Sequence, residues 1–96
     1  MSTPAVRIAV QEADFDVGVE LARARSRQGG QIGAVATFVG LVRDHDSGTD
    51  GEIAELFLEH YPGVTERSIE AVVEQALARW VLADVTIIHR VGQLSG

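Results

Sequence analysis

The sequence contains no cysteine and no lysine, and both absences narrow what the protein can do. Without cysteine, the 96-residue chain has neither disulfides nor thiolate metal ligands, as is typical of cytoplasmic proteins. Because lysine is missing, all eight basic residues are arginine. The net charge of −6 argues against a nucleic-acid partner, since phosphate backbones bind clustered cations.

Long hydrophobic runs are also absent. No stretch approaches the roughly 18 apolar residues of a membrane span, and the N-terminus lacks the basic head and apolar core of a signal peptide. We therefore expect a cytoplasmic protein without membrane partners. The composition, 46% hydrophobic and 23% charged, is that of a folded domain. At 96 residues the chain has room for a single domain, residues 1–96.

Hydrophobic periodicity predicts four strands and two helices. The expected strands are residues 6–11, 32–42, 52–61 and 85–91, and the expected helices are residues 14–27 and 65–80. Asp14 or Asp16 is expected to cap the first helix, and Gly29-Gly30 to end it. The order β-α-β-β-α-β indicates an α+β domain. The pattern alone suggests a ferredoxin-like sandwich with the helices on one face of a sheet.

The apolar stretch at residues 34–42 predicts a largely buried strand, and its character changes abruptly at Arg43. A guanidinium grips phosphate or carboxylate with two parallel hydrogen bonds, so Arg43 is a candidate anion-binding residue. The alternative is a surface ion pair with Asp44 or Asp46, which contributes less than about 1 kcal/mol. His45 lies between these aspartates in a polar loop, where it could titrate near neutral pH.

Other polar and aromatic residues have plainer interpretations. His60 and His89 share strand faces with apolar residues, which favours core histidines, and Trp80 ends an apolar helix stripe that is expected to be buried. Glu55 and Glu59 are expected on a solvated strand face. The arginines that end the first helix are expected at a solvated basic end: Arg23, Arg25 and Arg27.

The nearest metal pattern is a calcium loop, and it is incomplete. Gly48 stands where a ligand is needed, and Thr49 replaces the glycine of the sharp turn. We therefore predict no metal site, although the carboxylates have suitable offsets: Asp44, Asp46, Asp50, Glu52 and Glu55.

Four blocks of the sequence resemble one known family. They are TFVGLVRD at residues 37–44, LEHYPGVTE at 58–66, RW at 79–80 and IHRVGQL at 88–94. In order and separation they are similar to the catalytic large subunit of molybdopterin synthase, the MoaE family. The resemblance covers essentially the whole chain, but only about the first two-thirds of a typical family member.

The resemblance implies an α/β-hammerhead fold and a homodimer of large subunits. A small ubiquitin-like subunit docks on each, giving a heterotetramer. The small subunit's C-terminal Gly-Gly tail carries a thiocarboxylate. Two sulfurs pass from such tails to cyclic pyranopterin monophosphate and generate the dithiolene of molybdopterin. The implied activity is therefore a sulfurtransferase of molybdenum cofactor biosynthesis, with no bound cofactor.

Matched residue by residue, the resemblance implies a pocket formed with Phe38 and Arg43. By the same resemblance, Leu41 and Val42 are expected to contact the substrate. From its place in the polar loop, and not from the resemblance, His45 is expected to contribute as well. Arg43 is the catalytic candidate, because the substrate phosphate and the thiocarboxylate are both anionic. At an effective dielectric near 20, one charge pair about 4 Å apart is worth about 4 kcal/mol, so one fixed cation can decide the barrier.

The sequence departs from the family in one respect. The family's second His-Arg pair and its two catalytic lysines lie in a segment that would follow Gly96, and this chain contains no lysine. His89-Arg90 belongs to the earlier block. We therefore expect a truncated large subunit that is inactive alone. The alternative is a non-catalytic interaction or dimerisation module derived from that subunit.

Overall fold

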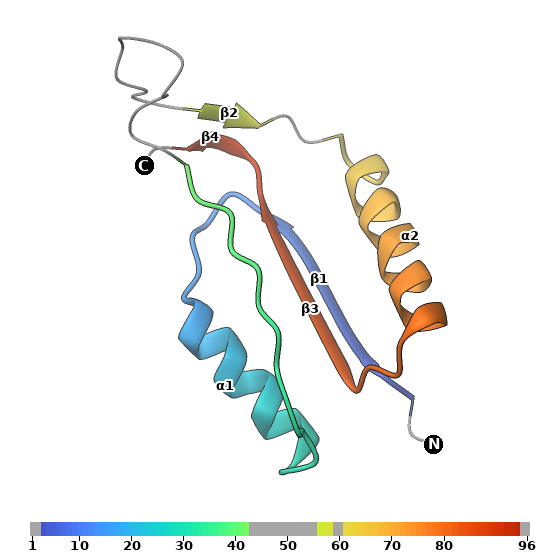
Figure 1. Cartoon of the computed structure of the whole chain (residues 1–96). Helices are drawn as coiled ribbons and strands as arrows, with labels where there is room; N and C mark the ends of the chain where they lie inside the picture. Colours follow the sequence, from blue (N-terminus) through green and yellow to red (C-terminus); the bar gives the residue numbers. More distant parts are fainter. Residues whose placement is uncertain (1–2, 43–55, 59–60, 95–96) are drawn as a thin grey trace, which may run out of the picture.

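The computed structural model describes residues 3–42, 56–58 and 61–94 (Figure 1). The elements run in the order β1 (Ala5–Gln11), α1 (Val17–Gln28), β2 (Leu56–Leu58), α2 (Val64–Arg79), β3 (Asp84–Arg90) and β4 (Gly92–Leu94). This mixture of helices and strands confirms the α+β class. Within the described ranges, no helix is long and apolar enough to cross a membrane.

The described strands form two small sheets. β1 pairs with β3 in parallel over its whole length, from Ala5 opposite Asp84 to Gln11 opposite Arg90. β2 pairs with β4 in the antiparallel sense. β4 follows β3 after a single residue, Val91, so the chain passes directly from the first sheet into the second (Figure 1).

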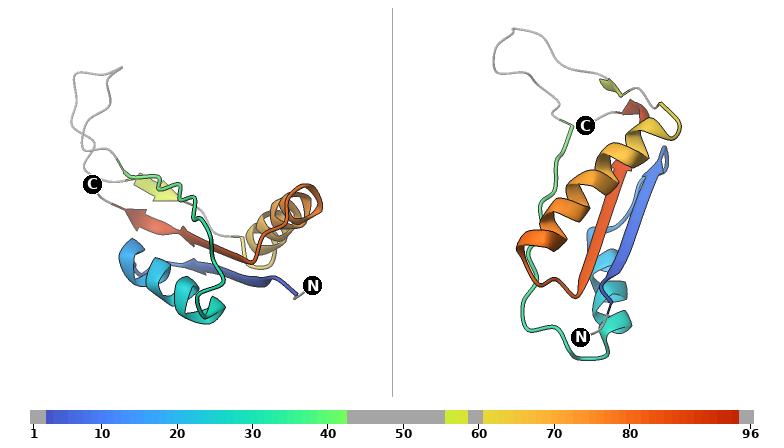
Figure 2. Two further views of the ribbon diagram at one scale, coloured as in Figure 1. Left: turned by 60° about the horizontal axis from the view of Figure 1, so that its bottom comes forward. Right: turned by 90° about the vertical axis from the view of Figure 1, so that its right-hand side faces the viewer.

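The two helices lie on opposite sides of the β1–β3 sheet (Figures 1 and 2). Arg7 and Asp84 form ion pairs with α1, so their face of the sheet looks toward that helix. Side chains alternate along a strand, so Ile8 and Ile87 belong to the other face, which α2 covers. The ferredoxin-like arrangement is therefore wrong. A parallel pair presents side chains on both faces, and here each face is covered by its own helix.

Local signals set the ends of α1 as predicted. Asp16 is the N-cap, and its carboxylate accepts a hydrogen bond from the Val19 N–H at 3.0 Å. Gly29 ends the helix in the left-handed conformation, with φ 55°. α2 begins after Gly63, whose N–H donates to the Glu66 carboxylate. α2 lies within one residue of its predicted bounds at each end, whereas α1 begins three residues later than predicted and ends one residue later.

The core of the described residues is small. Its buried hydrophobic residues are Val73 on α2, Val91 between β3 and β4, and Leu94 at the end of β4. Trp80, expected in the core, is 55% exposed, so that prediction is wrong. α2 ends at Arg79, and the extended backbone of Trp80 takes its ring off the buried stripe. The Arg79 guanidinium lies 4.6 Å from the centroid of that ring.

The strand expected at residues 32–42 is not formed. The segment runs as an open trace after α1 (green in Figure 1), and no backbone hydrogen bond joins it to another described strand. A strand needs a partner, and each described strand is paired with another one. β4 is a strand that the sequence did not predict. Of the strand expected at residues 52–61, Leu56–Leu58 is confirmed. Glu55, Glu59 and His60 lie outside the described residues.

The corner between β3 and β4 depends on glycine. Gly92 has φ 88°, a conformation that costs an L-amino acid about 1–2 kcal/mol. We expect Gly92→Ala to lower the free energy of unfolding by about this amount. A Cβ there would lie 3.4 Å from a Glu12 carboxylate oxygen, an ordinary contact, so the loss comes from backbone strain.

Gly33→Ala is the matched control for this prediction. Gly33 has no positive φ and open space around its Cα, so its replacement is expected to change the unfolding free energy by less than about 0.5 kcal/mol. Urea denaturation measures both variants. Equal losses from the two substitutions would contradict the role given to Gly92.

Candidate functional site

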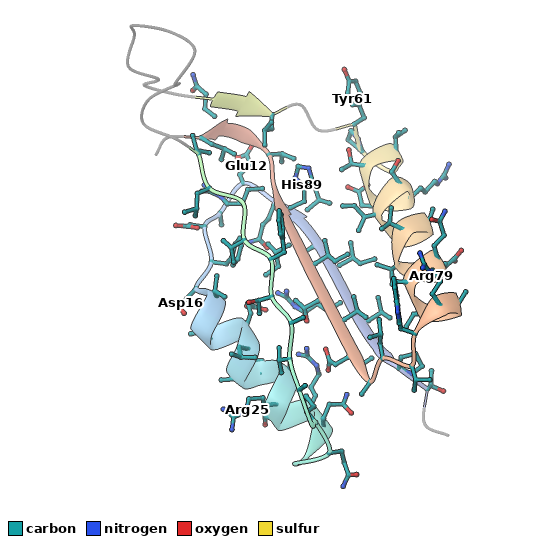
Figure 3. The ribbon with its side chains drawn as sticks, viewed as in Figure 1. Glu12, Asp16, Arg25, Tyr61, Arg79 and His89 are labelled. Carbon is teal, nitrogen blue, oxygen red and sulfur yellow. The ribbon has the colours of Figure 1, made fainter. Side chains whose placement is uncertain are left out.

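An open groove lies where the chain leaves α1 and enters the segment that carries the predicted pocket residues. Its volume is about 970 Å³. Arg25 supplies its charge, and Figure 3 shows this residue on α1. The rest of the lining is small or aliphatic: Ala22, Ser26, Gly29, Gly30, Ile32, Gly33, Ala34 and Val35.

The end of α1 is fixed to the start of β3 by a charged network. Two nitrogens of the Arg27 guanidinium donate to the two Asp84 carboxylate oxygens, each at 2.9 Å. Arg27 also donates to the Thr86 hydroxyl at 3.1 Å, and the Gln28 amide donates to Asp84 at 3.1 Å. The Asp84 side chain is only 5% exposed. Arg27 is exposed, as the sequence predicted, and it also joins the end of α1 to the start of β3, which the sequence did not predict.

This network shifts the titration of both partners. The hydrogen bond from Arg27 is the main cause that holds the pKa of Asp84 below its ordinary value. Burial raises the pKa of Asp84, whereas its hydrogen bonds with Gln28 and Thr86 lower this pKa further. The pKa of Arg27 is raised, chiefly by the hydrogen bond to Asp84. The ionised pair is therefore the form that the fold stabilises.

Acid is expected to release this stabilisation. A carboxylate whose pKa is lowered by folding contributes stability above its unfolded pKa of about 4, and loses it as the pH falls through the folded value. We expect Asp84→Asn to lower the melting temperature by several degrees at pH 7. The two proteins should converge in acid. Thermal melts from pH 7 down to about pH 2 measure the difference.

Asp14→Asn is the control for the acid prediction. The Asp14 side chain is 81% exposed and lies 3.8 Å from the Arg90 guanidinium, so its loss should leave the melting temperature nearly unchanged. A gap between wild type and Asp84→Asn that persists undiminished in acid would contradict the account.

A second set of hydrogen bonds lies at the other end of β3, opposite the network of Arg27 and Asp84. Arg90 donates two hydrogen bonds to the backbone oxygen of Glu12, at 2.7 and 3.0 Å, and the Val91 N–H donates to the Gln11 oxygen at 2.9 Å. His89 is half-buried beside α2, with its Nδ1 2.8 Å from the Arg90 oxygen (Figure 3). This end of β3 therefore fixes the loop after β1, a role that the sequence did not reveal.

The predicted pocket residues lie on the open segment. Phe38 is 97% exposed, Leu41 is 83% exposed and Val42 is half-buried. Arg43 and His45 lie outside the described residues. The structure thus brings Phe38, Leu41 and Val42 together on one segment, but no described residue encloses Phe38. A pocket around it requires further protein surface.

No metal site is found in the described part of the chain. Within it, no three histidine, aspartate or glutamate side chains lie close enough together to hold an ion. The carboxylates of the incomplete calcium loop, between residues 44 and 55, lie outside the described residues.

Comparison with known proteins gives matches over most of the chain. The family described as "MoaE protein" matches residues 10–96. The molybdopterin synthase catalytic subunit of Ralstonia nicotianae is 52% identical over 87 residues, which cover 91% of this chain and 48% of that protein. The protein of the same name from Salmonella typhimurium is 47% identical over 88 residues, covering 92% and 56%.

A solved structure matches the fold as well. The molybdopterin biosynthesis MoaE protein from Burkholderia ambifaria MC40-6 superimposes with a TM-score of 0.74 and 45% sequence identity. The match covers 92% of this chain and 56% of that one. The chain thus spans about half the length of the curated relatives it matches.

Proposed function

The chain belongs to the MoaE protein family, and on that premise we propose that it forms part of a molybdopterin synthase catalytic subunit. In this proposal it serves molybdenum cofactor biosynthesis in the cytoplasm, without a resident cofactor. The observation that carries the proposal is the family match, which includes both the open segment and Arg43.

The proposed reaction is sulfur transfer. The donor is the C-terminal thiocarboxylate of a small ubiquitin-like subunit, and the acceptor is cyclic pyranopterin monophosphate. Two sulfurs are transferred, giving the dithiolene of molybdopterin. The proposed assembly is a homodimer of large subunits with one small subunit docked on each.

The proposed roles follow from charge and polarity. Phe38, Leu41 and Val42 supply an apolar wall against which a peptide tail and the pterin can lie. Arg43 offsets the repulsion between two anionic reactants, since fixed cations near developing charge lower a barrier most effectively. His45 contributes from the loop. The exposure of Phe38 and Leu41 supports these roles, because both side chains are free to contact a bound partner.

A second candidate function is a non-catalytic interaction module. The absence of lysine favours it for this chain taken alone, since an anionic substrate loses the amines that could bind it or assist transfer. The module would keep the docking surfaces of the family without its chemistry.

One assay separates the two functions. Thiocarboxylated small subunit and pterin precursor are supplied to this chain, and to a chimera in which residues 10–96 replace the matched region of the Burkholderia ambifaria protein. The proposal predicts dithiolene product from the chimera and none from the chain alone. A chimera that binds both reactants but forms no product would favour the module.

A further inference from the structure

Residues 89–92 form the corner at which the chain leaves the first sheet and enters the second, and the proposed reaction assigns no role to them. Arg90 ends β3, and Gly92 begins β4. β4 then pairs with β2, with Leu94 opposite Leu56. The direction in which the chain leaves this corner therefore sets where the second sheet lies.

The Arg90 side chain holds this corner to the end of β1. Its Nε and one terminal nitrogen donate to the same acceptor, the backbone oxygen of Glu12, at 3.0 and 2.7 Å. Beside them, the Val91 N–H donates to the Gln11 oxygen at 2.9 Å. Hydrogen bonds from a charged donor are about twice as strong as those between neutral groups. The Arg90 side chain is 30% exposed, so water competes only in part for these two bonds.

The turn beyond Arg90 is fixed by burial and by its backbone conformation. Val91 before the turn is 4% exposed and Leu94 after it is 5% exposed. Between them, Gly92 turns the chain with φ 88°. The Glu12 side chain lies against this glycine, and Figure 3 shows Glu12 at the bend. A turn with buried side chains on both sides opens less readily than an exposed loop. The corner can therefore pass the position of β3 on to β4.

β4 lies next to the proposed binding site. The far end of the open segment, residues 32–42, lies beside β4 in Figure 1 and in both views of Figure 2. This segment carries the apolar wall proposed to receive the tail, formed by Phe38, Leu41 and Val42. No backbone hydrogen bond joins the segment to another described strand. Its far end therefore depends on side-chain packing against neighbours such as β4.

We propose that Arg90 is a positioning residue for the apolar wall of Phe38, Leu41 and Val42. By holding the corner to Glu12, Arg90 sets the place of β4 and, through β4, the place of the wall's far end. This inference rests on the proposed function, because it requires that the wall binds the small subunit's tail. Arg90 acts through β4 and needs no contact with either reactant.

Steady-state kinetics of the chimera test the proposal. Arg90→Ala should raise KM for the thiocarboxylated small subunit at least about fivefold and leave kcat within about twofold, because a displaced wall weakens binding equally in the ground and transition states. A merely structural role gives the opposite result, since partial unfolding lowers the concentration of active enzyme, and with it kcat, without changing KM. Arg90→Lys keeps a charged donor that can form one of the two hydrogen bonds, so its KM should lie between the two.

Arg27→Ala is the matched control. Arg27 also donates two hydrogen bonds to one acceptor group, but that group is the Asp84 carboxylate at the other end of β3, away from β4. Its loss leaves a buried carboxylate without its cation, so the melting temperature should fall at least as far as in Arg90→Ala. KM should nevertheless stay at the wild-type value. An equal rise of KM in the two variants would overturn the proposal.

Hydrogen exchange of the 96-residue chain tests the same role without substrate. Arg90→Ala should speed exchange of the backbone amides of β2 and β4 at least about tenfold, and leave those of α2 within about twofold. Uniformly faster exchange, or unchanged exchange in β4, would overturn the proposal, as would a wild-type KM in Arg90→Ala. A chimera that forms no product even with Arg90 intact would contradict the proposed function instead, and the exchange result would then decide the role of Arg90.

Discussion

Replacing Arg43 by alanine is expected to reduce dithiolene formation at least tenfold in the chimera described above, while leaving its melting temperature nearly unchanged. Arg43 is proposed to neutralise charge between two anionic reactants, and a nearby charge pair is worth several times the 1.4 kcal/mol that corresponds to a tenfold effect. Turnover with thiocarboxylated small subunit, together with a thermal melt, measures both quantities.

Two further variants sharpen the test of Arg43. Arg43→Lys keeps the charge but loses the bidentate geometry, so an intermediate rate is expected. Arg67→Ala removes an exposed arginine of α2 and should change neither rate nor stability. A collapse of stability in Arg43→Ala would show that the arginine is structural, and the proposed role would then be wrong.

Val73→Ala is expected to destabilise the chain by about 2 kcal/mol, through lost apolar burial and the cavity left behind. Val73 is 4% exposed and is the buried residue of α2. This loss is a large share of the total stability, because few other side chains of the described residues are buried. Urea denaturation of the chain measures it.

The neighbouring valine provides the control for Val73. Val72 is 61% exposed on the same helix. Val72→Ala therefore makes the same substitution, with nearly the same effect on helix propensity, at a position outside the core. Its expected effect is less than about 0.5 kcal/mol. Similar losses at both positions would contradict the burial of α2 against the β1–β3 sheet.

The helices could be predicted from the sequence because their determinants are local. Asp16 and Gly29 bound α1 through contacts within a few residues, and the apolar stripe of α2 needs only helical spacing. Trp80 shows where this reasoning fails. Its spacing continues the stripe, but the helix ends one residue earlier and the ring stays on the surface.

The pairing of elements could not be predicted in the same way, because it joins distant residues. Arg27 and Asp84 are 57 positions apart, and nothing in either neighbourhood indicates the other. The parallel register of β1 and β3 is equally non-local. The segment at residues 32–42 has the composition of a buried strand, but composition specifies neither a partner nor a cover.

The candidate site also has some features that the sequence predicts and others that it does not. The apolar character of Phe38, Leu41 and Val42 could be predicted, and so could their place on one segment. Their exposure could not, because it depends on how the segment packs against residues that are distant in the sequence. The roles of Arg43 and His45 stay predictions, drawn from the resemblance and from the charges of the proposed reactants.

The most direct test of the central claim is a crystal structure of the chimera with the small subunit's tail bound. We expect the Arg43 guanidinium to face a cavity beside Phe38 and to form an ion pair with the terminal carboxylate of the tail. An Arg43 side chain that points into bulk solvent, far from any cavity able to admit a peptide tail, would contradict it.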